Sequence, residues 1–255
     1  MKTLKSLSIL ILALMFQPSA DAQHTAAPKK TSSKKILIIV SNASVIGPNH
    51  RKTGVFLDEV AHPYVEFDHA GYQIDFASLT GEVPHLDNLE AKDEASNAEF
   101  LNNGGWKKMQ NNRKLADVDV RKYDAIFVPG GLAPMVDMPE NARLKQVIKE
   151  TYERNAVVGA VCHGPVSLLN VKLSDGTYLV KGKNIASFTT EEEANYAIAD
   201  VPFDLQTALM AQGAIFHAAA PWASNSIVDG NLVTGQNPAS AKLVGKNMIA
   251  LLEAK

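Results

Sequence analysis

The chain of 255 residues contains a single cysteine. One cysteine cannot form a disulfide within its own chain, so a disulfide scaffold and a cysteine-rich zinc module are both excluded. The sequence also lacks a G-x-G-x-x-G fingerprint and a G-x-x-x-x-G-K-[ST] loop, which disfavours a Rossmann cofactor and a P-loop nucleotide. These absences make Cys162 the first residue to explain.

A surplus of positive charge is absent as well. The chain has 25 Lys and Arg against 27 Asp and Glu, and no stretch rich in Lys and Arg stands out. Phosphate binding needs a basic patch or stripe, so nucleic acid is not expected as a partner. The hydrophobic content of 46% is ordinary for a globular protein of one large α/β domain, and no internal repeat indicates a second one.

The N-terminus has the pattern of an export signal. Lys2 and Lys5 precede an apolar stretch from Leu7 to Phe16, and Ala20-Asp21-Ala22 follows as a small-x-small cleavage site. The stretch is shorter than the ~20 residues that span a bilayer, which disfavours the alternative of an uncleaved anchor. We therefore expect residues 1–22 to be a signal peptide. The mature protein would then be periplasmic or secreted and would not be attached to the membrane.

The rest of the chain alternates between strand and helix patterns. Residues 23–34 are polar and predict a disordered leader, and residues 35–255 predict one domain with a polar insertion at 81–118 that is a lid or a decoration. Expected strands are 36–40, 73–79, 125–128, 157–161 and 184–189, with a hairpin at 226–234. Expected helices are 54–70 (capped by Thr53, kinked or divided at Pro63 and ended by Gly71), 141–154, 164–169, 191–199, 203–211 and 239–252. This order predicts an α/β, flavodoxin-like three-layer sandwich with a mostly parallel sheet.

Cys162 lies where a buried strand meets a helix, in the sequence Ala-Val-Cys-His-Gly-Pro. Such a strand–nucleophile–helix elbow exposes a thiol at the carboxyl end of the sheet, where α/β folds bind ligands. A helix N-terminus is expected to lower the pKa of the thiol, and the His163 amide is placed to bind an oxyanion. The alternative is a buried structural cysteine that behaves as a small hydrophobe.

Other candidate residues have both a functional and a structural interpretation. Gly130 and Gly131 follow a strand and offer backbone amides to an oxyanion, or form an ordinary tight turn. His163 and His217 are candidate bases for a nucleophilic cysteine. Candidate acids are Glu59 and one of residues 191–193, although a surface helix also explains them. The pairs Glu59/His62 and Glu66/His69 have metal-ligand spacing but lack a third ligand, so no metal is expected.

Several motifs in order resemble the ThiJ/PfpI family of the class I glutamine amidotransferase-like superfamily, and most closely its heat-shock-inducible glyoxalase III branch. They are Thr-Gly-Val-Phe-Leu-Asp-Glu-Val-Ala-His-Pro (53–63), Phe-Val-Pro-Gly-Gly (127–131), Ala-Val-Cys-His-Gly-Pro (160–165), Gly-Lys-x-Ile-x-x-Phe-Thr (182–189) and Leu-Val-Thr-Gly-Gln-Asn-Pro-Ala-Ser (232–240). The resemblance runs from about Lys35 to Leu252.

The resemblance implies a role for each candidate residue. Cys162 is the nucleophile, His163 its partner, Glu193 the acid that orients the histidine, and Glu59 the proton shuttle. It implies that the Gly130 and Gly131 amides bind the oxyanion. The implied activity is a cofactor-independent glyoxalase, or D-lactate dehydratase, that converts methylglyoxal to lactate. The implied partners are a small aldehyde and a second copy of the chain in a homodimer.

Two other functions stay open from the sequence. A stress chaperone or protein deglycase with a redox-sensing cysteine uses the same thiol. A cysteine hydrolase or peptidase is suggested by the chain order Cys162, Glu193, His217. Glutaminase activity is disfavoured because no His-x-Glu pair follows Cys162.

Overall fold

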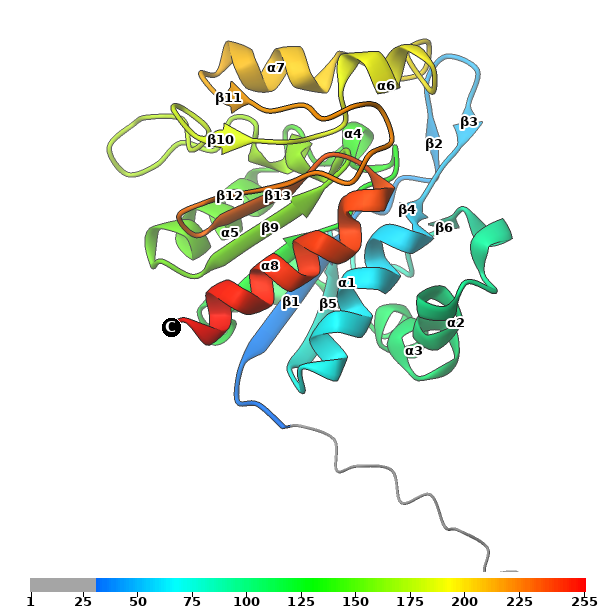
Figure 1. The fold of residues 1–255 in the computed structure, drawn as a ribbon, viewed down its shortest axis with the longest axis vertical. Helices are drawn as coiled ribbons and strands as arrows, with labels where there is room; N and C mark the ends of the chain where they lie inside the picture. The colour runs from blue at the N-terminus through cyan, green and yellow to red at the C-terminus, as the bar shows by residue number, and fades with distance from the viewer. Residues whose placement is uncertain (1–30) are drawn as a thin grey trace, which may run out of the picture.

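A computed structural model describes residues 31–255 of the chain. The expected signal peptide and residues 23–30 of the expected leader lie outside the described residues. A seven-stranded sheet forms the centre of the molecule, in the order β12-β13-β9-β8-β1-β5-β7 (Figure 1). Its strands are β1 (Lys35–Val40), β5 (Gln73–Ser78), β7 (Arg113–Lys114), β8 (Ala125–Val128), β9 (Val157–Val161), β12 (Ser226–Asp229) and β13 (Leu232–Gly235).

The sheet is parallel throughout, except that β12 pairs antiparallel with β13. The five long parallel strands β1, β5, β8, β9 and β13 lie in the order 2-1-3-4-5 of the flavodoxin-like fold when they are counted along the chain. In such a sheet the direction of winding reverses between the first and third strands, here β1 and β8. Ligands bind at the carboxyl ends of the strands near this point, which identifies the edge to search for a site.

Helices cover both faces of the sheet. α1 (Leu57–His69) and α8 (Ala241–Glu253) pack on one face and α5 (Ala142–Glu153) packs on the other (Figure 1). Successive residues of β1 belong to opposite cores, with Ile36 and Ile38 on the α1 side and Leu37 on the α5 side. A strand buried on both faces needs a continuous apolar run, which is why the pattern at 36–40 is unbroken. The three-layer prediction is confirmed.

Pro63 neither divides nor ends the helix that contains it. α1 runs from Leu57 to His69 with Pro63 inside. The proline ring costs the helix one backbone hydrogen bond, and packing against α8 compensates, because Gly245 lets the two backbones approach there: a Cβ on Gly245 would lie 3.0 Å from Pro63 Cα. The predicted cap at Thr53 is also wrong, since α1 begins after Phe56 and has no side-chain cap.

Several local elements are shorter than the sequence predicts. The expected strand 184–189 is a strand only over β10 (Asn184–Ile185), and the expected helix 164–169 is a 3-10 segment, Gly164–Leu168. The expected helices 191–199 and 203–211 contract to α6 (Thr190–Ala194) and α7 (Leu205–Ala211). The short elements not expected are β2 (Val45–Ile46), β3 (Arg51–Lys52), β4 (Val55–Phe56), β6 (Leu86–Asp87), β11 (Ile215–Phe216) and α4 (Pro134–Asp137).

The polar segment 81–118 has secondary structure of its own. It contains α2 (Ala95–Asn102), α3 (Gly105–Gln110) and the edge strand β7. Phe100 of α2 packs edge-on against Tyr64 of α1, with ring centroids 5.2 Å apart, and the Asn97 side-chain amide donates to the Asp58 carboxylate. The segment is therefore held against α1, beside the β5 and β7 edge of the sheet (Figure 1). None of the helices within residues 31–255 is long and apolar enough to cross a bilayer.

Candidate active site

Cys162 forms the tight turn directly after β9. Its φ of +60° lies in the left-handed region, which is strained for a residue with a side chain and recurs at nucleophile elbows. Two backbone bonds hold the turn: the Cys162 N–H donates to the Gly235 carbonyl, and the Phe188 N–H donates to the Cys162 carbonyl, both at 2.9 Å. Gly164 is required two residues later, because a Cβ there would lie 2.4 Å from the Val128 carbonyl oxygen.

A chain of hydrogen bonds runs from Cys162 through His163 to Glu193. Cys162 Sγ lies 3.3 Å from His163 Nδ1, and His163 Nε2 lies 2.7 Å from Glu193 Oε2. The side chains of His163 and Glu193 are 1% and 2% exposed. A carboxylate only accepts hydrogen bonds, so the neutral imidazole carries its proton on Nε2 and Nδ1 is free to accept the thiol proton. The three residues are therefore arranged for base-assisted nucleophilic attack.

Glu59 reaches the same thiol from α1 on the other side. It is fully buried, and its Oε2 accepts a hydrogen bond of 2.8 Å from the Gly130 N–H. Burial raises the pKa of Glu59 to about 8, although the Cys162 thiol and the Gly130 amide partly oppose this shift. Apart from the neighbouring thiol, Glu59 Oε1 finds no hydrogen-bond partner in the part of the chain that the structure describes. A protonated carboxyl with one uncommitted oxygen therefore lies beside the nucleophile.

The expectation of a lowered thiol pKa is wrong in direction. Burial raises the pKa of Cys162 well above its ordinary value, and the nearby Glu59 carboxyl raises it further, whereas the His163 and Gly131 amides lower it only in part. The physical reason is that desolvation outweighs the amide dipoles, because only a short 3-10 segment follows the cysteine. The resting thiol keeps its proton until His163 takes it.

The backbone around Gly130 and Gly131 packs too closely for side chains. A Cβ on Gly130 would lie 2.5 Å from Glu59 Oε2, and one on Gly131, where φ is +83°, would lie 2.4 Å from the Gly54 carbonyl oxygen. The Gly130 N–H is already bonded to Glu59. The amides that face the Cys162 sulfur are those of Gly131 and His163. The two glycines of the motif thus have different partners: the Gly130 amide binds the Glu59 carboxyl, and the Gly131 amide faces the Cys162 sulfur.

These groups face a small, partly enclosed cavity of about 40 Å³. By volume it holds about three water molecules, so it accepts a compound of a few heavy atoms. Its lining residues are Phe56, Glu59, Gly131, Cys162, His163, Phe188, Tyr196, Trp222 and Pro238. None comes from 81–118, so the segment is no lid over this cavity.

Sequence reasoning missed the aromatic residues of this cavity. The rings of Phe188, Tyr196 and Trp222 contact one another edge-on, with centroids 5.5 to 6.1 Å apart, and Phe188 lies 4.4 Å from the His163 ring. The Arg51 guanidinium lies over the outer ring of this group, 4.7 Å from the Tyr196 centroid. Aromatic residues in loops carry no periodic signal, so only the fold brings them together.

The other sequence candidates lie elsewhere. His217 Nε2 bonds to Asn184 Oδ1 at 2.7 Å and does not line the cavity, which removes the geometric basis for the Cys162, Glu193, His217 order. His62 bonds to Glu94, the N-cap of α2, and His69 bonds to Glu99 of α2, so neither histidine reaches a shared centre. Across the described residues, no group of three or more His, Cys, Asp or Glu side chains is placed to hold a metal ion.

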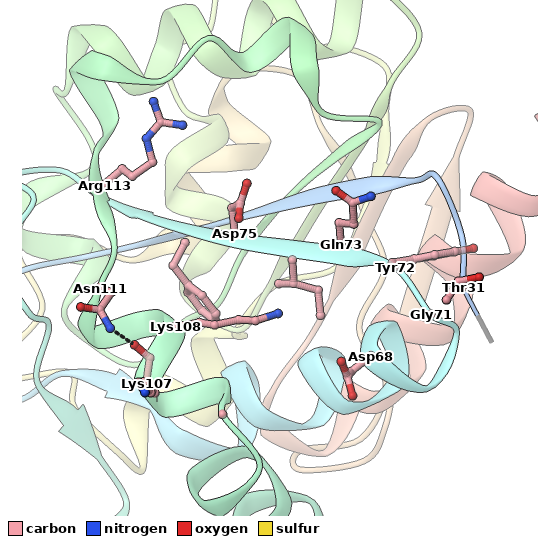
Figure 2. Close-up of a pocket in the computed structure, with 13 residues that line it drawn as sticks. Thr31, Asp68, Gly71, Tyr72, Gln73, Asp75, Lys107, Lys108, Asn111 and Arg113 are labelled. Atoms are coloured by element: carbon pink, nitrogen blue, oxygen red, sulfur yellow. Dashed lines mark hydrogen bonds between the residues drawn. The ribbon is translucent and has the colours of Figure 1, made fainter. Parts of the chain in front are cut away.

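A larger cavity, of about 730 Å³, lies along the outer edge of β5, away from Cys162 (Figure 2). In this view Asp75, Gln73 and Arg113 lie on one side of the β5 ribbon and Lys107 and Lys108 on the other. No cysteine or histidine lines this cavity. It therefore lacks a thiol–imidazole pair such as Cys162 and His163, and the small cavity over Cys162 remains the candidate active site.

The chain is similar to several proteins that bear the name glyoxalase. It is 31% identical to "Glyoxalase 3" of Candida albicans over 86% of this chain and 98% of that one. It is 33% identical to "Glutathione-independent glyoxalase HSP31" of Saccharomyces cerevisiae, over 84% and 94%. The crystal structure of glyoxalase III from Candida albicans superposes with a TM-score of 0.79 at 29% identity, covering 88% of this chain and 99% of that one.

A family match covers both the elbow at Cys162 and most of the sheet. The DJ-1/PfpI family model matches residues 53–251, which include every residue of the hydrogen-bonded chain and the Glu59 carboxyl. The chain belongs to the DJ-1/PfpI family.

Proposed function

We propose that this protein is a glutathione-independent glyoxalase that converts methylglyoxal and water to lactate, the reverse of a D-lactate dehydration. The observation that carries the proposal is the placement of the Cys162 thiol and the protonated Glu59 carboxyl in one small cavity. Curated relatives at about 30% identity that bear the name glyoxalase support it. A 2-oxoaldehyde of a few heavy atoms suits the cavity in size.

The first step is addition of the thiol to the aldehyde. Cys162 Sγ bonds to the aldehyde carbon while His163 Nδ1, 3.3 Å away, takes the thiol proton. Glu193 stabilises the imidazolium that forms. Glu59 gives its proton to the carbonyl oxygen, so the product is a neutral hemithioacetal and Glu59 is now a carboxylate.

The second step moves hydrogen between the two carbons. The Glu59 carboxylate removes the proton from the carbon bonded to sulfur, and the neighbouring ketone oxygen takes a proton from the His163 imidazolium to give an enediol. Glu59 then delivers its proton to the second carbon, and the hydroxyl on the first carbon returns a proton to the Glu59 carboxylate as the thioester forms. One carbon is oxidised and its neighbour is reduced, so the step needs no external oxidant or reductant.

The last step is hydrolysis. Water attacks the thioester carbonyl, with its oxygen held by the Gly131 and His163 amides that face the sulfur. The carbon–sulfur bond breaks, the thiolate recovers its proton, and lactic acid leaves. Overall one water is consumed for each aldehyde, and all protein groups return to their starting state.

The alternatives differ in what the cavity has to admit. A peptidase, a deglycase acting on intact proteins and a chaperone all require access for a polypeptide, and a cavity of only about 40 Å³ favours none of them. A glycated peptide, an aggregating client protein and a peptide substrate are therefore the comparison substrates for the test.

The experiment is incubation of the purified protein with methylglyoxal in the absence of glutathione, with lactate measured enzymatically. We expect lactate to form in proportion to methylglyoxal consumed, at a kcat/KM at least about a hundredfold above that for removal of the adduct from a glycated peptide. Consumption of methylglyoxal without lactate, or a preference for the glycated peptide, would reject the proposal.

We also propose that the protein acts outside the cytoplasm. The support is the basic start, the apolar stretch from Leu7 to Phe16 and the Ala20-Asp21-Ala22 site. Expression of the full chain in a Gram-negative host, followed by fractionation and intact mass measurement, should give a periplasmic protein that begins near Gln23. A full-length cytoplasmic product would contradict this. The same preparation, run through size exclusion with light scattering, tests the proposed homodimer.

A further inference from the structure

The cavity over Cys162 has one exposed wall, and that wall is Trp222. Among the nine lining residues, Trp222 is 48% exposed. The catalytic side chains, Gly131 and Phe188 are buried, and the other three are half-buried. Its indole contacts the rings of Phe188 and Tyr196 at centroid distances of 5.5 and 6.1 Å. The indole therefore stands between the reacting sulfur and the exterior.

The loop that carries Trp222 is fixed by a buried carboxylate, Glu192. Glu192 is 0% exposed. Its Oε1 accepts hydrogen bonds from the backbone N–H of Trp222 at 2.8 Å, from Asn237 Nδ2 at 2.8 Å and from Gln236 Nε2 at 3.1 Å. Its Oε2 accepts from the N–H and the hydroxyl of Thr189, both at 3.0 Å. Five donors thus satisfy one buried charge, which is the condition for keeping it buried.

The partners of Glu192 hold the rest of the same loop. The Asn237 amide donates to the Ala223 carbonyl at 2.9 Å, and Gln236 Oε1 accepts from the Ala219 N–H at 2.8 Å. The backbone of Trp222 has a φ of +62°, a conformation that a residue with a side chain keeps only when its surroundings fix it. Residues on both sides of the indole are therefore tied to one buried network.

We propose that Trp222 is the lid that limits the size of compounds reaching Cys162, and that Glu192 is the positioning residue that holds this lid closed. The size limit would select small 2-oxoaldehydes over bulky ones. In that respect the lid proposal rests on the proposed glyoxalase function. Access to the thiol is a property of the cavity itself and is testable without turnover. Glu192 adjoins Glu193, so α6 presents one acid to the lid and the next to His163.

The test uses two thiol reagents of different bulk, N-methylmaleimide and N-phenylmaleimide, with each rate divided by the rate of the same reagent with a free thiol. Cys162 is the sole cysteine, so every modification reports this site. We expect the wild type to react much faster with the methyl reagent. Trp222→Ala should raise the ratio of the phenyl rate to the methyl rate by about tenfold or more. Glu192→Ala should raise it in the same direction but less, and Glu192→Gln, which keeps one acceptor oxygen, less still.

Matched controls separate the lid from a general loosening of the fold. Trp106→Ala removes the other tryptophan of the chain, which lines a different cavity, and Glu191→Gln changes the exposed neighbour of Glu192. Both should leave the reagent ratio at the wild-type value. An unchanged ratio in Trp222→Ala, or an equal increase in the controls, would overturn the proposal. Trp222→Phe serves as a milder variant with an intermediate ratio.

A second measurement compares kcat/KM for phenylglyoxal and methylglyoxal in the same variants. The ratio should rise in Trp222→Ala in parallel with the maleimide ratio. If Trp222→Ala raises the maleimide ratio but the wild type turns over neither aldehyde, the proposed glyoxalase activity fails and the lid stands. If both aldehydes are turned over and Trp222→Ala changes neither ratio, the lid fails and the activity stands.

Discussion

At the scale of single residues, the site depends on where three protons lie. His163 holds one on Nε2 because Glu193 can only accept it, Cys162 holds one on sulfur because burial raises the pKa of the thiol, and Glu59 holds one because burial raises the pKa of its carboxyl to about 8. Each residue is neutral at rest, apart from Glu193. Charge therefore develops only when a substrate is attacked.

Replacing Glu193 tests the role of its charge. Glu193→Gln keeps a side chain of the same size but removes the negative charge that stabilises the His163 imidazolium. We expect kcat for methylglyoxal to fall by about 10² to 10⁴, with KM nearly unchanged. Steady-state kinetics measures both. Glu191→Gln, in the exposed position two residues earlier, is the control and should keep the wild-type kcat; equal values in both variants would remove Glu193 from the mechanism.

Burial of Glu59 makes stability depend on pH. Its pKa is 4.5 in an exposed chain and about 8 here. A carboxyl whose pKa rises on folding stabilises the folded state fully at low pH, and this contribution is lost as pH rises through the window from 4.5 to about 8. Glu59→Gln cannot ionise, so it should lack this loss.

The measurement is urea unfolding of both proteins at about pH 5 and about pH 9. The free energy of unfolding of Glu59→Gln minus that of the wild type should be larger at the higher pH. Glu66→Gln, on the same helix and paired with Lys242 at the surface, is the control and should show a much smaller change. A pH-independent difference for Glu59→Gln would show that Glu59 does not carry a proton in the fold.

Local patterns located the nucleophile but not all of its partners. Cys162 and the Gly130 and Gly131 turn are visible because a buried strand runs directly into each. Glu193 is different, because three adjacent glutamates start α6 and each points to a different side of it. Glu193 reaches His163, Glu192 reaches the Trp222 loop and Glu191 is exposed. Family resemblance singled out Glu193, and periodicity alone did not.

At the scale of elements, α6 positions the two buried acids, Glu192 and Glu193, that hold the Trp222 loop and His163. Its capping box joins Thr189 and Glu192: the Glu192 N–H donates to Thr189 Oγ1 at 3.1 Å, and the Thr189 N–H donates to Glu192 Oε2 at 3.0 Å. The helix has only five residues, so propensity alone does not stabilise it. Capping and the bonds of its two buried glutamates decide whether it forms.

Thr189→Ala should therefore affect activity as well as stability. Loss of the capping hydroxyl costs about 1 kcal/mol, and the shift of α6 should lower kcat through Glu193. Asn141→Ala is the matched control, since Asn141 caps α5 through its bond to the Leu144 N–H and lies outside the cavity. It should lose a similar stability and no activity. Thermal unfolding measures the loss of stability in both variants, and steady-state kinetics measures kcat. A normal kcat in Thr189→Ala would show that the position of α6 does not affect catalysis.

The long elements were predictable and the short ones were not. Continuous apolar runs predict β1, β8 and β9 because both faces of these strands are buried, and the hairpin of β12 and β13 is confirmed, with Gly230 at a φ of +60° in its turn. Two-residue strands such as β6 and β7 exist only through pairing with a distant partner. No pattern within the segment indicates them.

At the scale of the whole molecule, we expect that a substitution in the sheet can lower the free energy of unfolding without changing the rate of catalysis. Leu37 is 0% exposed in the core on the α5 side, whereas Cys162 belongs to the core on the α1 side. We expect Leu37→Ala to lower the free energy of unfolding by about 2 to 5 kcal/mol and to leave kcat of the folded protein unchanged at 25 °C.

Val228→Ala is the control for that substitution. Val228 is 44% exposed on the edge strand β12, so its truncation should change stability by less than about 0.5 kcal/mol. Denaturant unfolding measures both variants. A loss of kcat in Leu37→Ala that matches its loss of stability would mean that the scaffold and the site are not separable.

The central claim is that the Cys162 thiol forms the covalent bond to the aldehyde. The direct measurement is the rate of lactate formation from methylglyoxal without glutathione, in the wild type and in Cys162→Ala, with folding of both confirmed by circular dichroism. The account predicts a fall in rate of at least about a thousandfold, because removing the sulfur removes the hemithioacetal and every later step. Equal rates in the two proteins would contradict it.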